Sequence, residues 1–278
     1  MSPGLTIAAI LVTMTILSLI EAIAPLHARG RWNDAHLGPN LSLTFITFAT
    51  NAFLNAGLVL LVAYLEAKGI GLLHALSVAP LPAAGIAILS LDFSFYVAHR
   101  AMHADSGLWR FHSVHHSDPA VDVTTTVRQH PVEGLIRYAF MTAAVAAVGP
   151  SPAAFAIYRL WSALNGLFEH ANVRTPRRLD DLLSLVITTP NVHKVHHSRV
   201  KTETNTNYGN ITSLFDRLFS TFTSSARGVN IVYGLDGFDD PATQTTAGLL
   251  ALPFRPFRRK EDDDAKHCLG GRTSLDLS

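Results

Sequence analysis

The chain has 278 residues, of which 48% are hydrophobic and only 15% are charged, and its net charge is +1. A soluble domain usually carries about a quarter charged residues, so this composition is typical of a membrane protein. The near-neutral charge creates no field that would recruit nucleic acid. The single cysteine, Cys268, excludes a disulfide framework, an iron–sulfur cluster and a multi-cysteine zinc site. Since there are 14 histidines, a tight metal site must rely on imidazole and carboxylate.

Apolar stretches long enough to cross a bilayer, which takes about 20 residues, recur between residues 5 and 169. They predict membrane segments at 5–20, 41–65, 82–99, 132–148 and 152–169. The last two are shorter, each contains an arginine, and a tight "GPSP" turn joins them. They are either full crossings or a hairpin that dips in and returns. We therefore predict an all-α fold with four to five membrane-spanning helices.

Basic residues predict the orientation of these segments. They follow the first, third and fifth segments, whereas the gaps after the second and fourth carry at most one Lys–Glu pair. Five segments with the N-terminus outside and the C-terminus in the cytoplasm satisfy every loop. On this topology all dense histidine clusters lie at the cytoplasmic face, in a helical cap on the membrane helices.

Three histidine clusters stand out because residues three and four apart share one face of a helix. The clusters are "HRAMH" (His99, His103), "HSVHH" (His112, His115, His116) and "HKVHH" (His193, His196, His197). Each cluster aims two or three imidazoles at one point. Eight imidazoles exceed the ligand set of one metal and suit two metals that share a site. Packing gives no reason to bury so many imidazoles, which would be costly without partners.

Two other histidines are candidate ligands. His170 ends the fifth segment at the same depth as the clusters, and His130 in "VRQHPVEGL" is the weaker candidate. Either could instead position a ligand or a lipid head group. We interpret Trp109 and Arg110, which precede the second cluster, as interfacial anchors.

Polar groups beside the clusters are candidates for orienting the ligands. Asp92, Tyr96 and His99 recur at helical spacing, and Asp92 interrupts an apolar segment, where ionisable groups are expensive. Its carboxylate could orient an imidazole through the second ring nitrogen, or could act as a cap. Glu169, next to His170, is a second candidate acceptor.

The pattern HX3H, HX2HH, HX2HH on a multispanning chain resembles the fatty acid hydroxylase / sterol desaturase superfamily, over about Leu91 to Phe222. The matching stretches are "LDFSFYVAHRAMH", "FHSVHHS", "RQHPVE", "FEHANVRTP", "TPNVHKVHHS" and "NYGNITSLFDRLFSTF". The resemblance implies two iron ions held by the eight histidines, O2 as co-substrate, and hydroxylation or desaturation of a sterol, fatty acyl, carotenoid or ether lipid. Some relatives have a further HX3H box. Here Gly166 stands four residues before His170, which favours eight or nine ligands over ten.

Oxidation of an aliphatic C–H bond is beyond any side-chain acid or base, whereas iron with open positions can bind and reduce O2. The electrons need a separate donor, because the chain has no cysteine cluster, GxGxxG or haem-attachment motif. A ferredoxin, a flavoprotein reductase or a small haem protein would serve. We predict a docking surface for it, or for anionic lipid, formed by Arg177, Lys194, Arg199 and Lys201.

Two alternatives remain, a membrane metal transporter or sensor and a non-catalytic relative. A transporter would place its ligands near mid-membrane, whereas these lie at one face, and intact boxes argue against loss of catalysis.

The sequence predicts three regions. Residues 1–80 form N-terminal membrane helices, residues 81–238 form a fatty acid hydroxylase/sterol desaturase-like catalytic domain, and residues 239–278 form a tail. Within the second region, 176–190 has the spacing of a short interfacial helix. The charged end of the tail, low in core-forming residues, predicts that the tail is largely disordered.

Overall fold

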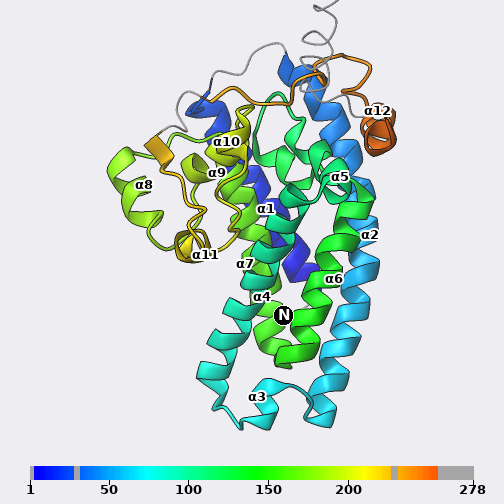
Figure 1. The fold of residues 1–278 in the computed structure, drawn as a ribbon, viewed down its shortest axis with the longest axis vertical. Helices are drawn as coiled ribbons and strands as arrows, with labels where there is room; N and C mark the ends of the chain where they lie inside the picture. The colour runs from blue at the N-terminus through cyan, green and yellow to red at the C-terminus, as the bar shows by residue number, and fades with distance from the viewer. Residues whose placement is uncertain (1–2, 28–31, 227–230, 256–278) are drawn as a thin grey trace, which may run out of the picture.

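The computed structural model describes residues 3–27, 32–226 and 231–255, and every regular element within these ranges is a helix (Figure 1). The longer helices are α1 (Pro3–Ile23), α2 (Trp32–Lys68), α4 (Pro80–Ala104), α5 (Ser106–His116), α6 (Pro131–Val148) and α7 (Pro152–His170). The shorter ones are α3 (Leu72–Ala75), η1 (Val123–Val127), α8 (Arg177–Leu183), α9 (Pro190–His196), α10 (Lys201–Thr204), α11 (Leu214–Leu218), α12 (Thr246–Ala251) and η3 (Leu252–Phe254). The all-α prediction is confirmed.

Among the described residues, four helical stretches are long and apolar enough to cross a membrane. They are Gly4–Ile23, His36–Ala75, Pro80–Ala104 and Pro131–Val148. Within an apolar 18-residue window of each stretch, only 11% to 33% is buried inside the protein, which leaves apolar side chains exposed for contact with lipid. The fifth predicted segment forms α7, a helix of 19 residues, but is not one of these four.

The turn between α6 and α7 lies at the same end of the bundle as the connection from α2 to α4. Gly149 in this turn and Gly71 before α3 both have positive φ, at +67° and +126°, and their backbones touch. A Cβ on either glycine would collide with the backbone of the other turn, so only glycine fits. The α6–α7 hairpin therefore runs the length of the bundle to its far end.

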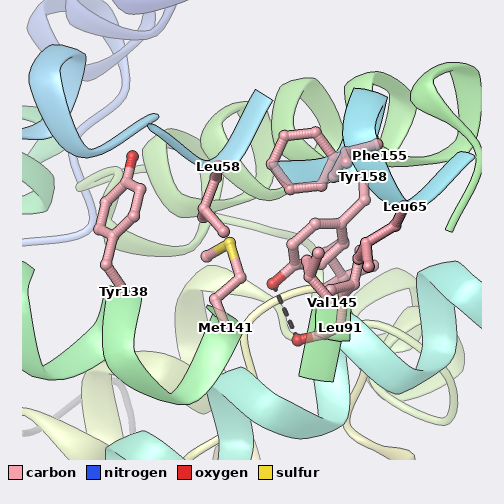
Figure 2. Packing of buried hydrophobic residues seen from close by; sticks show 10 residues of the cluster. Leu58, Leu65, Leu91, Tyr138, Met141, Val145, Phe155 and Tyr158 are labelled. Atoms are coloured by element: carbon pink, nitrogen blue, oxygen red, sulfur yellow. Dashed lines mark hydrogen bonds between the residues drawn. The ribbon is translucent and has the colours of Figure 1, made fainter. Parts of the chain in front are cut away.

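A hydrophobic core in the middle of the bundle joins α2, α4, α6 and α7 (Figure 2). Leu58 from α2, Leu91 from α4, Met141 from α6 and Tyr158 from α7 all belong to it. The Tyr158 hydroxyl donates to the Leu91 carbonyl oxygen at 3.1 Å, which satisfies the one polar atom that this ring brings into the core. Because α4 and α7 both continue to the opposite end, this core sets their histidines in register.

The end opposite the two glycines is polar and held by a buried arginine. The Arg128 guanidinium donates to the Val114 carbonyl at 3.0 Å and to the Asn40 side chain at 2.9 Å. It also donates to Ser117 at 3.0 Å and to the Gln244 side chain at 2.7 Å. Burial alone would raise the pKa of neighbouring Asp118, but Arg128 and the hydrogen bonds around the carboxylate hold it well below its usual range. This network ties the last turn of α5 to α2 and to the segment before α12.

The C-terminal region departs from the predicted disorder. Leu249 of α12 and Leu252 of η3 are buried against Leu43 of α2 and Val114 of α5. Four apolar side chains in contact stabilise this segment, so residues 246–254 are ordered within the region predicted to be a largely disordered tail. Residues 239–245 and 255 of that tail are also described, whereas residues 256–278 lie outside the described residues.

The Arg128 network predicts a large loss of stability in Arg128→Met. The change removes four hydrogen bonds and the positive charge that compensates buried Asp118, which costs about 3–5 kcal/mol. The midpoint of thermal denaturation in detergent should fall by many degrees. Arg177→Met is the control, since Arg177 is exposed and pairs with exposed Asp181 at 3.6 Å. Equal midpoints for the two variants would contradict the role of Arg128.

Candidate metal centre

Nine histidines gather in two adjacent groups where α4, α5, α7 and α9 meet, in the upper half of Figure 1. The first group is His99, His103, His112, His116 and His196, and the second is His115, His170, His193 and His197. Within each group the candidate ligand atoms lie within 4.8 Å of one another. The structure thus brings together the eight cluster histidines and His170. His130 lies outside both groups and caps α6, where its Nδ1 accepts from the Val132 amide at 3.2 Å.

The two HX2HH clusters are shared between the groups in opposite ways. On α5, His112 and His116 join the five-histidine group while His115 joins the other. At α9 the assignment is reversed: His193 and His197 join the four-histidine group, whereas His196, between them, joins the five-histidine group. Residues four apart lie almost above one another on a helix, whereas adjacent residues point about 100° apart. The spacing therefore lets one helix contribute imidazoles to both groups.

The inward-facing Nε2 atoms lie at the distances that ligands of one ion would have. They are 3.0 Å apart between His99 and His112 and 3.1 Å apart between His115 and His170. In the four-histidine group, the Nε2 atom of His193 lies 3.0 Å from that of His170. A metal–nitrogen bond of about 2.0–2.1 Å places neighbouring ligand nitrogens about 3.0–3.4 Å apart.

Two further Nε2 atoms, those of His103 and His196, are buried without a hydrogen-bond partner among the described residues. A buried nitrogen without a partner is costly unless an ion supplies the missing interaction. The unpartnered Nε2 atoms and the short distances between the inward-facing Nε2 atoms together show that the residues fit a pair of metal ions.

Backbone carbonyls hold three of the rings by the outer nitrogen. The carbonyl oxygens of Tyr208, Thr206 and Gly166 lie 2.8, 2.7 and 2.7 Å from Nδ1 of His99, His196 and His170, respectively. A proton on Nδ1 can donate only to the carbonyl, which leaves the Nε2 lone pair directed inward.

Gly166 lies one helical turn before His170. This is the position at which a tenth histidine would complete a further HX3H box. A Cβ on Gly166 would lie 3.3 Å from the Thr126 methyl group, tighter than ordinary packing, while its carbonyl already serves His170.

A carboxylate that the sequence did not single out lies behind the second cluster. Glu133, in the first turn of α6, places Oε1 3.2 Å from Nδ1 of His112 and 3.9 Å from Arg137. Glu133 is fully buried, and its Oε2 has no hydrogen-bond partner among the described residues. The available signal was an acidic residue at the start of an apolar segment. The expected acceptor Glu169 lies farther from its rings, 3.8 Å from Nδ1 of His170.

Asp92 does not orient an imidazole as expected. Its two carboxylate oxygens accept from the backbone amides of Ile211 and Thr212, at 3.2 and 3.1 Å. The segment between α10 and α11 lies between this carboxylate and the imidazoles, and Asp92 satisfies the amides of that segment. Asp92 therefore supports the loop that carries Tyr208, whose carbonyl holds His99.

Tyr96 is separated from His103 by the ring of Tyr208. Its ring centroid lies 6.1 Å from that of Tyr208, and the Tyr208 ring lies 5.1 Å from His103.

Lys194 lies in the interior, so its predicted place on a docking surface is wrong. The side chain is fully buried, and Nζ donates to the carbonyls of His170 and Ala171 at 3.3 and 2.7 Å. Burial lowers the pKa of Lys194 to about 8. These bonds close the C-terminal end of α7, where His170 needs a fixed position. Of the other predicted docking residues, Arg199 pairs with Asp239, while Arg177 and Lys201 are exposed.

Trp109 contacts the site directly, which differs from the predicted interfacial anchor. Its ring centroid lies 4.9 Å from that of His103 and 5.3 Å from that of His116. The half-buried indole therefore covers one side of the five-histidine group.

Burial keeps the imidazoles in the ligating form. It lowers the pKa of His115 to about 3, and it lowers that of His196 to about 4 although two backbone hydrogen bonds oppose the change. Both rings are therefore neutral near pH 7, with a free lone pair for a metal.

Comparisons with known proteins agree with this geometry. The sequence profile described as "Fatty acid hydroxylase" matches residues 84–221, a range that contains both histidine groups. Residues 84–221 of the chain belong to this family. With the four candidate membrane spans, this makes the chain an integral membrane protein.

Curated relatives are lipid-modifying enzymes by name. The chain is 33% identical over 177 residues to ornithine lipid hydroxylase OlsE of Rhizobium tropici, covering 63% of this chain and 50% of that protein. It is 29% identical over 151 residues to human alkylglycerol monooxygenase, covering 54% and 32%. The chain therefore spans half or less of the length of these relatives. No solved structure gives a significant match.

The grouping predicts different metal contents for two histidine variants. His170→Ala removes the ligand at the centre of the four-histidine group, so bound metal should fall from two ions to about one per chain. His130→Ala is the matched control and should keep both ions, because His130 only caps α6. Elemental analysis of purified protein measures both values. Full metal content in His170→Ala would contradict the grouping.

A second prediction concerns Glu133. Glu133→Gln keeps the shape of the side chain but removes the carboxyl group beside Nδ1 of His112, so metal affinity should fall roughly 10- to 100-fold. Competition with a chromophoric chelator measures this affinity. Glu66→Gln, on exposed surface far from the site, should leave it unchanged. An unchanged affinity in Glu133→Gln would show that Glu133 does not tune the ligand.

Proposed function

We propose that this chain is an O2-dependent, non-haem di-iron oxidoreductase that hydroxylates or desaturates a membrane lipid. One observation carries the proposal: nine imidazoles converge in two adjacent groups at one end of an apolar helical bundle. That location supports an enzyme over a metal transporter, whose ligands would lie near mid-membrane. The complete ligand sets support catalysis over a non-catalytic relative.

The donor set supports iron. Imidazole suits iron, zinc and copper, and the groups contain no thiolate, the ligand that most favours zinc and copper(I). Iron bound here would supply the oxidant for an aliphatic C–H bond, with O2 as co-substrate. The proposed ligands are the nine grouped histidines, eight of which follow from the clusters alone.

The surrounding residues hold the ligands and exclude water. Glu21 of α1 accepts from the amides of Val123 and Asn172, at 2.8 and 2.7 Å, which pins α1 beside the segment that follows His170. Lys194 closes the end of α7 beneath it. Eight of the nine grouped histidines are buried and His103 is partly exposed, so a reactive species would be shielded from solvent.

The position of the site in the helical bundle supports a membrane lipid as the substrate. The proposed substrate is a membrane lipid, because the site lies at the end of helices whose surface suits lipid contact. The names of the relatives, a hydroxylase and a monooxygenase, favour insertion of oxygen over desaturation. Hydroxylation consumes O2 and two electrons, so a separate ferredoxin, flavoprotein reductase or small haem protein would supply them. We place the histidine end at the cytoplasmic face, where the basic segments between membrane helices gather.

Lipid analysis of cells tests this function. Cells that express the chain under 18O2 should contain a lipid with one labelled oxygen atom, or one lacking two hydrogens, detected by mass spectrometry. His196→Ala should abolish the product while the protein still inserts in the membrane, because the five-histidine group loses a ligand. His74→Ala, which lies at the far end of the bundle, is the control and should keep the product. Product formation by His196→Ala would overturn the proposal.

A further inference from the structure

A cleft on the outer face of α4 carries features of a ligand site and is separate from the metal centre. It has a volume of about 290 Å³. Its lining residues are Phe93, Tyr96, Val97, Arg100, Ala101 and Ala104 from α4 and Phe219 from the end of α11. Figure 1 shows α11 beside the upper part of α4. The α4 positions recur at helical spacing, so they form one continuous stripe.

Aromatic rings form one wall of the cleft. The Phe93 ring lies 5.8 Å from Phe219 in a stacked arrangement and 5.1 Å from Phe215. Phe93 and Phe219 are 38% and 41% exposed, although both are large apolar side chains. Ala101 and Ala104 leave space beside this wall. An alkyl chain would cover the exposed rings and fill that space.

One cation lies at the end of this apolar stripe. Arg100 donates to the Tyr96 hydroxyl at 3.3 Å. Within residues 3–27, 32–226 and 231–255, no carboxylate lies within ion-pair distance of its guanidinium. The nearby acids have other hydrogen-bond partners: Asp105 caps α5, and Asp216 accepts from the amides of Tyr208 and Gly209 and interacts with the Arg100 charge only beyond ion-pair distance. A guanidinium with unused donors is suited to phosphate.

The cleft lies where lipid head groups would be. It follows the last turns of α4, and α4 is one of the candidate membrane spans, Pro80–Ala104. Beside it, Leu218 of α11 is 72% exposed, which supports lipid contact on this side. Tyr96 and Tyr208 separate the cleft from His103, so this space is not the ligand shell of the metals.

We propose that this cleft binds an anionic membrane phospholipid, with one acyl chain along Phe93, Val97 and Phe219 and the phosphate on Arg100. The site is independent of the oxidation reaction proposed above. Charge decides the occupant: the apolar wall accepts any acyl chain, whereas an arginine without a carboxylate partner in the described structure favours an anionic head over a zwitterionic one.

Lipid titration of the full chain tests the site. The protein, purified in neutral detergent, is titrated with phosphatidylglycerol and separately with phosphatidylcholine, and bound lipid is counted by native mass spectrometry. The wild type should retain one phosphatidylglycerol in preference to phosphatidylcholine. Arg100→Gln should weaken phosphatidylglycerol binding roughly tenfold or more, the loss expected for a charge-assisted contact.

Two more variants keep the test decisive. Ala104→Leu fills the cleft from an exposed position without touching the core, so it should lower retention of both lipids. Arg178→Gln removes an exposed arginine on α8, outside the cleft, and should bind like the wild type. Metal content serves as the check that α4 is intact. Equal retention of the two lipids by the wild type, or wild-type phosphatidylglycerol binding by Ala104→Leu, would overturn the proposal.

Discussion

The structure depends on one constraint: imidazole nitrogens are buried about 3 Å from one another, where they cannot all form hydrogen bonds. Two facing nitrogens share at most one proton, and the Nε2 atoms of His103 and His196 have no hydrogen-bond partner in the part of the chain that the structure describes. Burial in this state is costly unless an ion lies between the rings. The centre is therefore stable only if the surrounding protein forces the rings together, and metal binding would return that free energy.

The elements around the centre hold the rings together, first through helix packing and then through contacts close to the rings. The apolar core around Tyr158 aligns α4 with α7, and Arg128 ties α5 to α2. Closer to the rings, Asp92 holds the loop whose carbonyls orient His99, and Lys194 closes α7 at His170. Asp92 and Lys194 thus fix backbone rather than contacting the ring nitrogens. A carboxylate reaches hydrogen-bonding distance of a ring nitrogen at Glu133.

Much of this was predictable from local pattern. Hydrophobic runs identified the helices, and the spacing of His112, His115 and His116 predicted clustered imidazoles, although His115 joins the other group instead of one common point. What local pattern could not supply was the division of the two HX2HH clusters between two histidine groups, which depends on how α5 and α9 face each other. Tertiary contacts also explain two predictions that were wrong, those for Lys194 and Asp92. Lys194 looks like a surface cation in sequence, but its neighbours bury it. Asp92 has the spacing of a ligand partner, but a loop more than 100 residues away takes both its oxygens.

The most direct test of two interleaved ion sites is anomalous X-ray scattering from crystals of the iron-loaded protein, with data collected at the iron absorption edge. The account predicts two peaks, one surrounded by His99, His103, His112, His116 and His196 and the other by His115, His170, His193 and His197. A single peak, or two peaks that each draw all their ligands from whole clusters, would contradict it.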